Sequence, residues 1–166
     1  MHRYFCVVTL VTAIDFLRWL HVIGAAVLLG TGAGIAFFMF MANRTRDPAL
    51  IAHTANIVVM ADMVFTASAV IVQPISGMLL AQQIGWPLTQ GWLMLSIALY
   101  LVTGLCWLPV VWIQIQLRNI ARNAAKNGEP LPARYHRLYR VWFALGIPAF
   151  LSVLAIIWLM LRKTVL

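Results

Sequence analysis

The chain has 166 residues, of which 63% are hydrophobic and 10% are charged, and its formal net charge is +8. A soluble domain is about 45–50% apolar and about 25% charged, so this composition excludes an ordinary water-soluble globule. Too few charged side chains remain to cover the outside of such a molecule. We therefore expect residues 1–166 to form a single transmembrane domain in contact with the lipid bilayer, without a separate soluble catalytic domain.

Four long apolar stretches predict four membrane-spanning helices, because a span needs about 20 apolar residues. The first covers about residues 14–42 and follows an interfacial lead-in, and Pro48 opens the second, which covers 49–80. Pro74 lies inside the second stretch, where we expect a kink. The third and fourth stretches cover about 91–121 and 139–161, separated by a basic linker over 122–134 with a helix stop at 127–130. The predicted fold class is all-α, an integral membrane four-helix bundle.

The Lys and Arg residues are concentrated in two of the three connections. The connection between the second and third stretches has none, whereas the other two hold Arg44, Arg46, Arg118, Arg122, Lys126, Arg134, Arg137 and Arg140. By the positive-inside rule, these two connections face the cytoplasm and both termini lie on the extracytoplasmic side. The positive charge is thus an orientation signal, and we expect no nucleic-acid partner.

A polar stripe follows one face of the second stretch. On an ideal helix the residues within about 40° of one another are Asp62, Thr66, Ala69, Gln73 and Ser76. Asp62 lies near mid-span, where a charged side chain costs at least about 2.5–3.5 kcal/mol. Two interpretations remain open: Asp62 is a proton relay or the partner of a bound cofactor, or the stripe forms hydrogen bonds between helices.

The third stretch carries a second polar face, and the first carries a histidine. The face on the third stretch consists of Ser96, Tyr100, Thr103, Trp107 and Gln114. His21 begins a stripe of small residues, against which either a helix or a flat ligand would pack. From their depths, we expect a site in the outer half of the bundle lined by His21, Gln73 and Ser96.

Other residues fit ordinary structural roles. Gly30 and Gly34 form a GxxxG pair that predicts close helix packing. Four tryptophans near span ends predict an aromatic belt at the membrane interfaces: Trp86, Trp92, Trp142 and Trp158.

Several segments together resemble a known family. They are residues 17–24, 61–67 and 72–77, together with Gly91-Trp92-Leu93 and Trp107-Leu108-Pro109. They resemble an uncharacterised bacterial family of predicted integral membrane proteins, domain of unknown function 2269, over about residues 14–163. The resemblance implies a multi-pass protein of the bacterial inner (plasma) membrane and brings no activity with it.

More distantly, the four-helix layout and the segment Leu20-His21-Val22-Ile23 resemble HemJ-type protoporphyrinogen oxidases and CopD-type copper proteins. The resemblance implies haem b in the bundle with His21 as an axial ligand of the iron. Ser96 stands where HemJ proteins have a lysine, and Met94 stands at a nearby histidine position. The second ligand would be Met94, Met78 or no side chain, in a pocket of His21, Met94, Ser96 and Gln73.

Two classes of function follow. The first is a membrane protein that binds haem b or a porphyrin for redox chemistry or electron transfer. The second is a non-enzymatic accessory or assembly subunit, or a small proton-linked carrier with Asp62 as its proton relay. No catalytic residue is assigned, and a homo-oligomer or a larger membrane complex is compatible with either class.

Overall fold

The computed structural model describes residues 2–162, and every regular element in that range is helical. The elements are α1 His2–Thr45, α2 Pro48–Ala61, the π-helical η1 Asp62–Thr66, α3 Ala67–Ile84, α4 Gly91–Asn127 and α5 Ala133–Arg162. Within this range four helical runs are long and apolar enough to cross a membrane: Thr12–Thr45, Pro48–Ile84, Gly91–Asn127 and Ala133–Arg162. The predicted all-α fold with four spans is confirmed.

The residues at the helix ends explain where the helices start and stop. Asp47 caps α2, because its side chain accepts a hydrogen bond of 2.8 Å from the Ala49 amide, and Pro48 occupies the first turn. α4 ends where Gly128 takes the left-handed conformation (φ 67°), and α3 ends in the same way at Gly85 (φ 80°). The predicted opening at Pro48 and the predicted helix stop at 127–130 are both confirmed.

The helices are longer than the apolar stretches. α4 continues to Asn127 and α5 begins at Ala133, so the linker expected over 122–134 is largely helical, and the fourth helix begins before residue 139. The expected lead-in before residue 14 is part of α1. Hydropathy marks the boundary of the hydrocarbon region, whereas Arg and Lys are good helix formers that continue a helix into the head-group region.

The second span departs from α geometry at a place that the prolines do not mark. α3 runs through Pro74 without a break, and the irregular segment is η1 instead. The buried residues of the second span are Ile51, Ala55, Val58, Val59, Asp62, Thr66, Ala69, Gln73, Ser76 and Ala81. Asp62 and Thr66 are the first and last residues of η1, so the π-helical segment begins and ends on the inward face.

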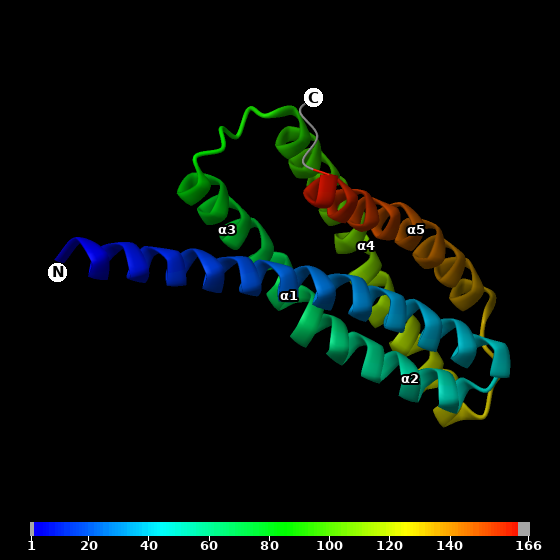
Figure 1. Ribbon diagram of the computed structural model, residues 1–166. Helices are drawn as coiled ribbons and strands as arrows, with labels where there is room; N and C mark the ends of the chain where they lie inside the picture. Colours follow the sequence, from blue (N-terminus) through cyan, green and yellow to red (C-terminus); the bar gives the residue numbers. More distant parts are fainter. Residues whose placement is uncertain (1, 163–166) are drawn as a thin grey trace.

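The packing differs between the two halves of the bundle. α1 packs against α2 and α3, and α4 packs against α5 and α2, so that α3 leans away from α4 and α5 (Figure 1). The main apolar core consists of Ile35, Met39, Ala42, Ile51, Ala55, Val58, Val110, Ile113, Leu117, Ala121, Tyr135 and Trp142. It lies where the end of α1, all of α2 and the α4–α5 hairpin meet, in the half of the bundle that carries the basic connections.

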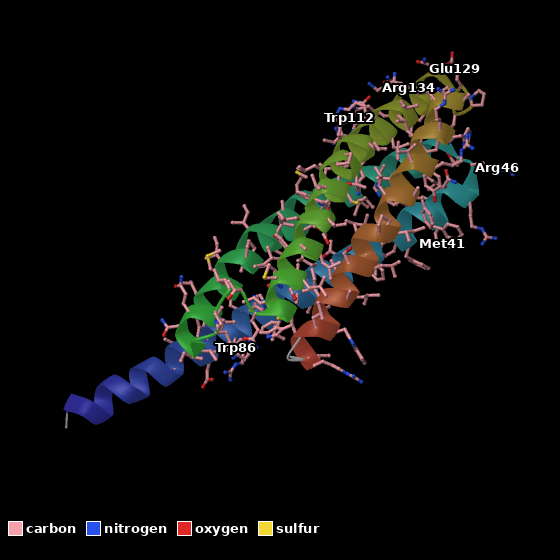
Figure 2. All side chains as sticks on the ribbon, turned by 90° about the horizontal axis from the view of Figure 1, so that it is seen from above. Met41, Arg46, Trp86, Trp112, Glu129 and Arg134 are labelled. Carbon is pink, nitrogen blue, oxygen red and sulfur yellow. The ribbon has the colours of Figure 1, made fainter. Side chains whose placement is uncertain are left out.

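Charge is distributed unequally between the two ends. Figure 2 shows Arg46, Glu129 and Arg134 at one end and Trp86 towards the other. Among the described side chains, residues 12–162, the one ion pair joins Arg18 to Asp15, at 3.5 Å. The eight basic residues of the two connections therefore form no ion pair with a carboxylate in the described chain, as expected for side chains that face water and lipid head groups.

Candidate functional site

Asp62 is the one buried carboxyl group among the described residues, and it lies at the first position of the π-helical segment. Its side chain is 2% exposed, whereas Asp15, Asp47 and Glu129 are exposed. The Trp107 indole on α4 donates a hydrogen bond of 3.3 Å to Asp62 Oδ1. The polar faces of the second and third spans therefore meet in a direct contact.

Gln114 extends this contact to the fourth span. In the amide orientation that satisfies both groups, its nitrogen donates to Asp62 Oδ2 (3.1 Å) and its oxygen accepts from the Trp142 indole (3.3 Å). Gln114 is 2% exposed and Trp142 is 4% exposed. Both carboxyl oxygens of Asp62 thus accept from neutral N–H groups, and no cation pairs with it in the described chain. We call Asp62, Trp107, Gln114 and Trp142 the central network.

The rest of the polar stripe on the second span is also buried. Thr66 and Gln73 are each 7% exposed, and Ser76 is 2% exposed. The Ser76 hydroxyl donates to the Val72 carbonyl at 2.8 Å, within its own helix. The face predicted from helical periodicity is therefore the inward face of η1 and α3.

His21 joins this stripe from α1. Its Nδ1 lies 2.8 Å from Ser76 Oγ, and Gln73 Nε2 donates to the His21 backbone carbonyl at 3.0 Å. When the Ser76 hydroxyl donates to the Val72 carbonyl, it accepts from His21 Nδ1–H, and Nε2 then carries the lone pair of the ring. The predicted proximity of His21 and Gln73 is thus present in the structure.

Two glycines allow α1 and α3 to approach this closely. A Cβ at Gly24 would lie 3.2 Å from Gln73 Nε2, and a Cβ at Gly77 would lie 3.1 Å from His21 Cε1. Any larger residue at either position would need the neighbouring side chain to move. The small residues near His21 therefore serve contact between helices at these two places.

The other residues of the expected haem pocket do not join His21. The Ser96 hydroxyl is buried but donates to the Trp92 carbonyl of its own helix, at 2.7 Å. Met94 is 56% exposed and Met78 is 51% exposed, so both thioethers lie largely on the outer surface.

The space at His21 is small as well. Of the ring atoms, Cε1 lies nearest α3, 3.1 Å from the position of a Gly77 Cβ, with Nδ1 at 3.7 Å and Nε2 at 3.9 Å. The ring is therefore closely packed on the side that faces Gly77. No group of three or more His, Cys, Asp or Glu side chains suited to a metal ion occurs among the described residues.

Two hollows lie outside this site. One, of about 490 Å³, is lined mainly by apolar residues of α1, α2 and η1, together with Gly30, Gly34 and two threonines. No atom lies within 4 Å of a Cβ placed at either glycine, so the packing predicted for the GxxxG pair is wrong within the described chain.

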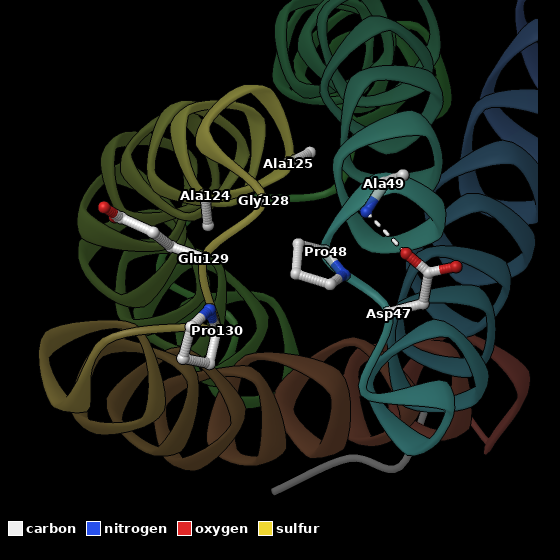
Figure 3. Close-up of a pocket in the computed structure, with 8 residues that line it drawn as sticks. All are labelled: Asp47, Pro48, Ala49, Ala124, Ala125, Gly128, Glu129 and Pro130. Carbon is white, nitrogen blue, oxygen red and sulfur yellow. Dashed lines mark hydrogen bonds between the residues drawn. The ribbon is translucent and has the colours of Figure 1, made fainter.

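The second hollow, of about 380 Å³, lies between the start of α2 and the end of α4, where Asp47 and Glu129 point apart (Figure 3).

Two of the four tryptophans assigned to the aromatic belt are interior residues. Trp142 belongs to the central network, and Trp92, 2% exposed, packs with Leu93 and Ala81. Trp158 is 58% exposed, as a belt residue would be. Position near a span end did not reveal Trp142 as the partner of Gln114. Trp142 lies on α5 and faces the polar side of α4 at the level of Gln114, and this placement explains its role.

Comparison with known proteins identifies one family. The sequence model of a family described as predicted integral membrane protein (DUF2269) matches residues 15–164. No curated protein and no solved structure matches the chain significantly.

Proposed function

The chain belongs to the DUF2269 family of predicted integral membrane proteins, and we propose that it is a proton-linked membrane carrier whose proton-binding group is the Asp62 carboxyl. One observation carries the proposal: Asp62 is 2% exposed and its contacts are neutral N–H donors. Ionisable residues inside a membrane domain are functional candidates by default, because their burial costs so much. A carboxyl group without a counter-charge changes its charge by binding or releasing a proton.

The local backbone supports the same assignment. Asp62 begins the π-helical turn, where one residue too many for an α-helix is accommodated. Single π-helical turns occur frequently at functional sites. In this protein the turn has Asp62 and Thr66 as its buried residues. A proton-binding carboxyl at Asp62 would therefore have polar side chains next to it along its own span.

Infrared spectroscopy tests whether Asp62 exchanges a proton. The chain has four acidic residues, and three of them are exposed: Asp15, Asp47 and Glu129. We expect the purified protein to show a protonated-carboxyl band that changes with pH and is missing in Asp62→Asn. Asp15→Asn is the matched control and should leave that band in place. A spectrum in which Asp62→Asn removes no such band would refute the proposal.

Transport measurements test the coupling. Candidate solutes are added to vesicles that contain the protein and a pH-sensitive dye. A coupled solute should change the internal pH in vesicles with the wild-type chain, and Asp62→Asn should abolish that change. A solute-driven pH change that persists in Asp62→Asn would show that another group couples the proton.

Binding of haem b or a porphyrin is the second candidate, and the state of His21 favours it. A histidine whose Nδ1–H is held by a neighbouring acceptor presents Nε2 to a metal, and Ser76 holds Nδ1 at 2.8 Å. The exposed Met94 and the limited space beside Gly77 disfavour it. An absorption spectrum decides: a Soret band with supplied haem that His21→Ala removes would support this candidate, and no such band would exclude it.

A further inference from the structure

Two buried polar atoms of the stripe lack a hydrogen-bond partner. They are Thr66 Oγ1 and Gln73 Oε1, and each side chain is 7% exposed. A buried polar atom without a partner costs about 1–3 kcal/mol, and most such atoms in folded proteins bind other groups or ordered water. Because both atoms lie on the face between Asp62 and Ser76, they mark positions for water inside the bundle.

The polar groups along this face recur at nearly every turn. Asp62 and Ser76 are separated by roughly 21 Å along the helix, at 1.5 Å per residue. Between Thr66 and Gln73, the Tyr100 hydroxyl from α4 reaches the span and donates to the Val70 carbonyl. The sequence of groups from mid-span outward is therefore Asp62, Thr66, Tyr100, Gln73 and Ser76.

His21 stands at the outer end of this series. It contacts Ser76 through Nδ1 and is itself only half-buried. Imidazole is the side chain that accepts and releases protons near neutral pH. The nearest charged residues on its own helix, Asp15 and Arg18, pair with each other, and α3 contains no charged residue.

In the opposite direction, the neighbours of Asp62 are unsuited to carry protons. They are the Trp107 and Trp142 indoles and the Gln114 amide, whose N–H protons do not dissociate near neutral pH. Two buried hydroxyls without partners lie nearer the basic end, on Tyr135 and Tyr139. Tyr135 stacks on Tyr139, and Tyr139 stacks on Trp142, so the central network separates both hydroxyls from the carboxyl.

We propose that His21 is the proton port of Asp62: water held by Thr66, Tyr100 and Gln73 carries protons between the two residues, at the end of the bundle opposite the basic connections. This inference rests on the proposed role of Asp62. A proton taken up at His21 Nε2 leaves the ring with two N–H groups. As Ser76 accepts the Nδ1 proton, it passes its own hydroxyl proton to the water chain, and one proton reaches the Asp62 carboxyl for each one taken up. The neutral ring is then protonated at Nε2, and exchange of the ring proton with water returns it to its starting form. No electron is transferred.

The rate of hydrogen–deuterium exchange at the Asp62 carboxyl tests the port. The purified protein is mixed with D₂O, and the isotope shift of the carboxyl band removed by Asp62→Asn is followed in time. His21→Asn keeps an N–H towards Ser76 but removes the titratable ring, and it should slow exchange by roughly a hundredfold. The matched control is His53→Asn, at an exposed histidine of α2 near the basic end, which should exchange at the wild-type rate.

A second pair of variants tests the water chain without changing His21. Thr66→Val preserves the side-chain shape and removes the hydroxyl, so it should slow exchange, whereas Thr66→Ser should not. Imidazole added to His21→Ala should restore part of the lost rate, which a merely structural role of His21 would not produce. Wild-type exchange rates in His21→Asn and Thr66→Val would overturn the port and leave the role of Asp62 intact. A missing Asp62 band would overturn both.

Discussion

The Tyr100 hydroxyl donates a hydrogen bond to the backbone carbonyl of Val70 on the neighbouring span. This carbonyl lies four residues before Pro74, which has no N–H to offer it. A side chain from α4 therefore supplies the donor that the proline removed from α3. This explains how α3 continues through Pro74 without a break in its helical structure.

The relationship predicts a coupled pair of substitutions. Tyr100→Phe should lower the free energy of unfolding by about 1–2 kcal/mol, since it leaves the Val70 carbonyl buried without a donor. In a Pro74→Ala background the helix supplies its own N–H, so the same change should cost much less. Unfolding of the four variants in detergent measures the coupling, and equal costs in the two backgrounds would contradict it.

A second prediction concerns the contact between α1 and α3. Gly77→Ala should destabilise the protein by about 1–3 kcal/mol, because the new Cβ would lie 3.1 Å from His21 Cε1. Gly30→Ala is the matched control, since a Cβ there has no atom within 4 Å. Thermal unfolding of both variants in the same detergent compares them. Because helix propensity favours Ala over Gly, a control as unstable as Gly77→Ala would show that contacts outside the chain, and not the approach of α1 to α3, determine the effect.

A third prediction concerns the central network. Gln114→Leu leaves Asp62 Oδ2 and the Trp142 indole without a partner. We expect a loss of about 1–3 kcal/mol for each buried group left unpaired, together with a change in tryptophan fluorescence. Gln116→Leu, two residues further along α4 and only partly buried, should have little effect on either. If both variants were equally stable, Gln114 would not bridge the two spans.

A fourth prediction concerns orientation in the membrane. The positive-inside rule places the connection that holds Lys126 in the cytoplasm and the connection after Gln83 outside. In intact cells, a membrane-impermeant thiol reagent should label Gln83→Cys and should label Lys126→Cys only after lysis. Both variants are made with the native Cys6 and Cys106 replaced by Ser. The reverse pattern of labelling would invert the assigned topology.

The sequence predicted the parts of the site that follow from helical periodicity. The stripe from Asp62 to Ser76 could be found because polar residues on one face of an apolar span are costly unless that face is buried. The contact of His21 with this stripe was expected from depth alone, and Gln73 and Ser76 do lie against His21.

The parts that were missed depend on how the helices are placed relative to one another. Ser96 lies at the expected depth, but α3 packs on α1 while α4 packs on α5 and α2, and its hydroxyl stays on its own helix. The role of Trp142 depends on the amide of Gln114 on another span. Depth along the membrane normal can be counted from a sequence, whereas lateral distance between spans cannot.

The π-helical turn at Asp62–Thr66 has a consequence for how this span can change in length. Each residue of an α-helix turns the chain by about 100°. Deleting one residue from the α-helical part of the span, between η1 and Gln73, would therefore rotate the following residues by roughly that angle, and Gln73 and Ser76 would turn away from α1. The π-helical segment already holds one residue more than an α-helical turn, so a one-residue deletion inside it would convert it to α-helix and leave Gln73 and Ser76 facing α1. Related chains can therefore differ by one residue at this segment, and only there, without loss of the contact between α1 and α3.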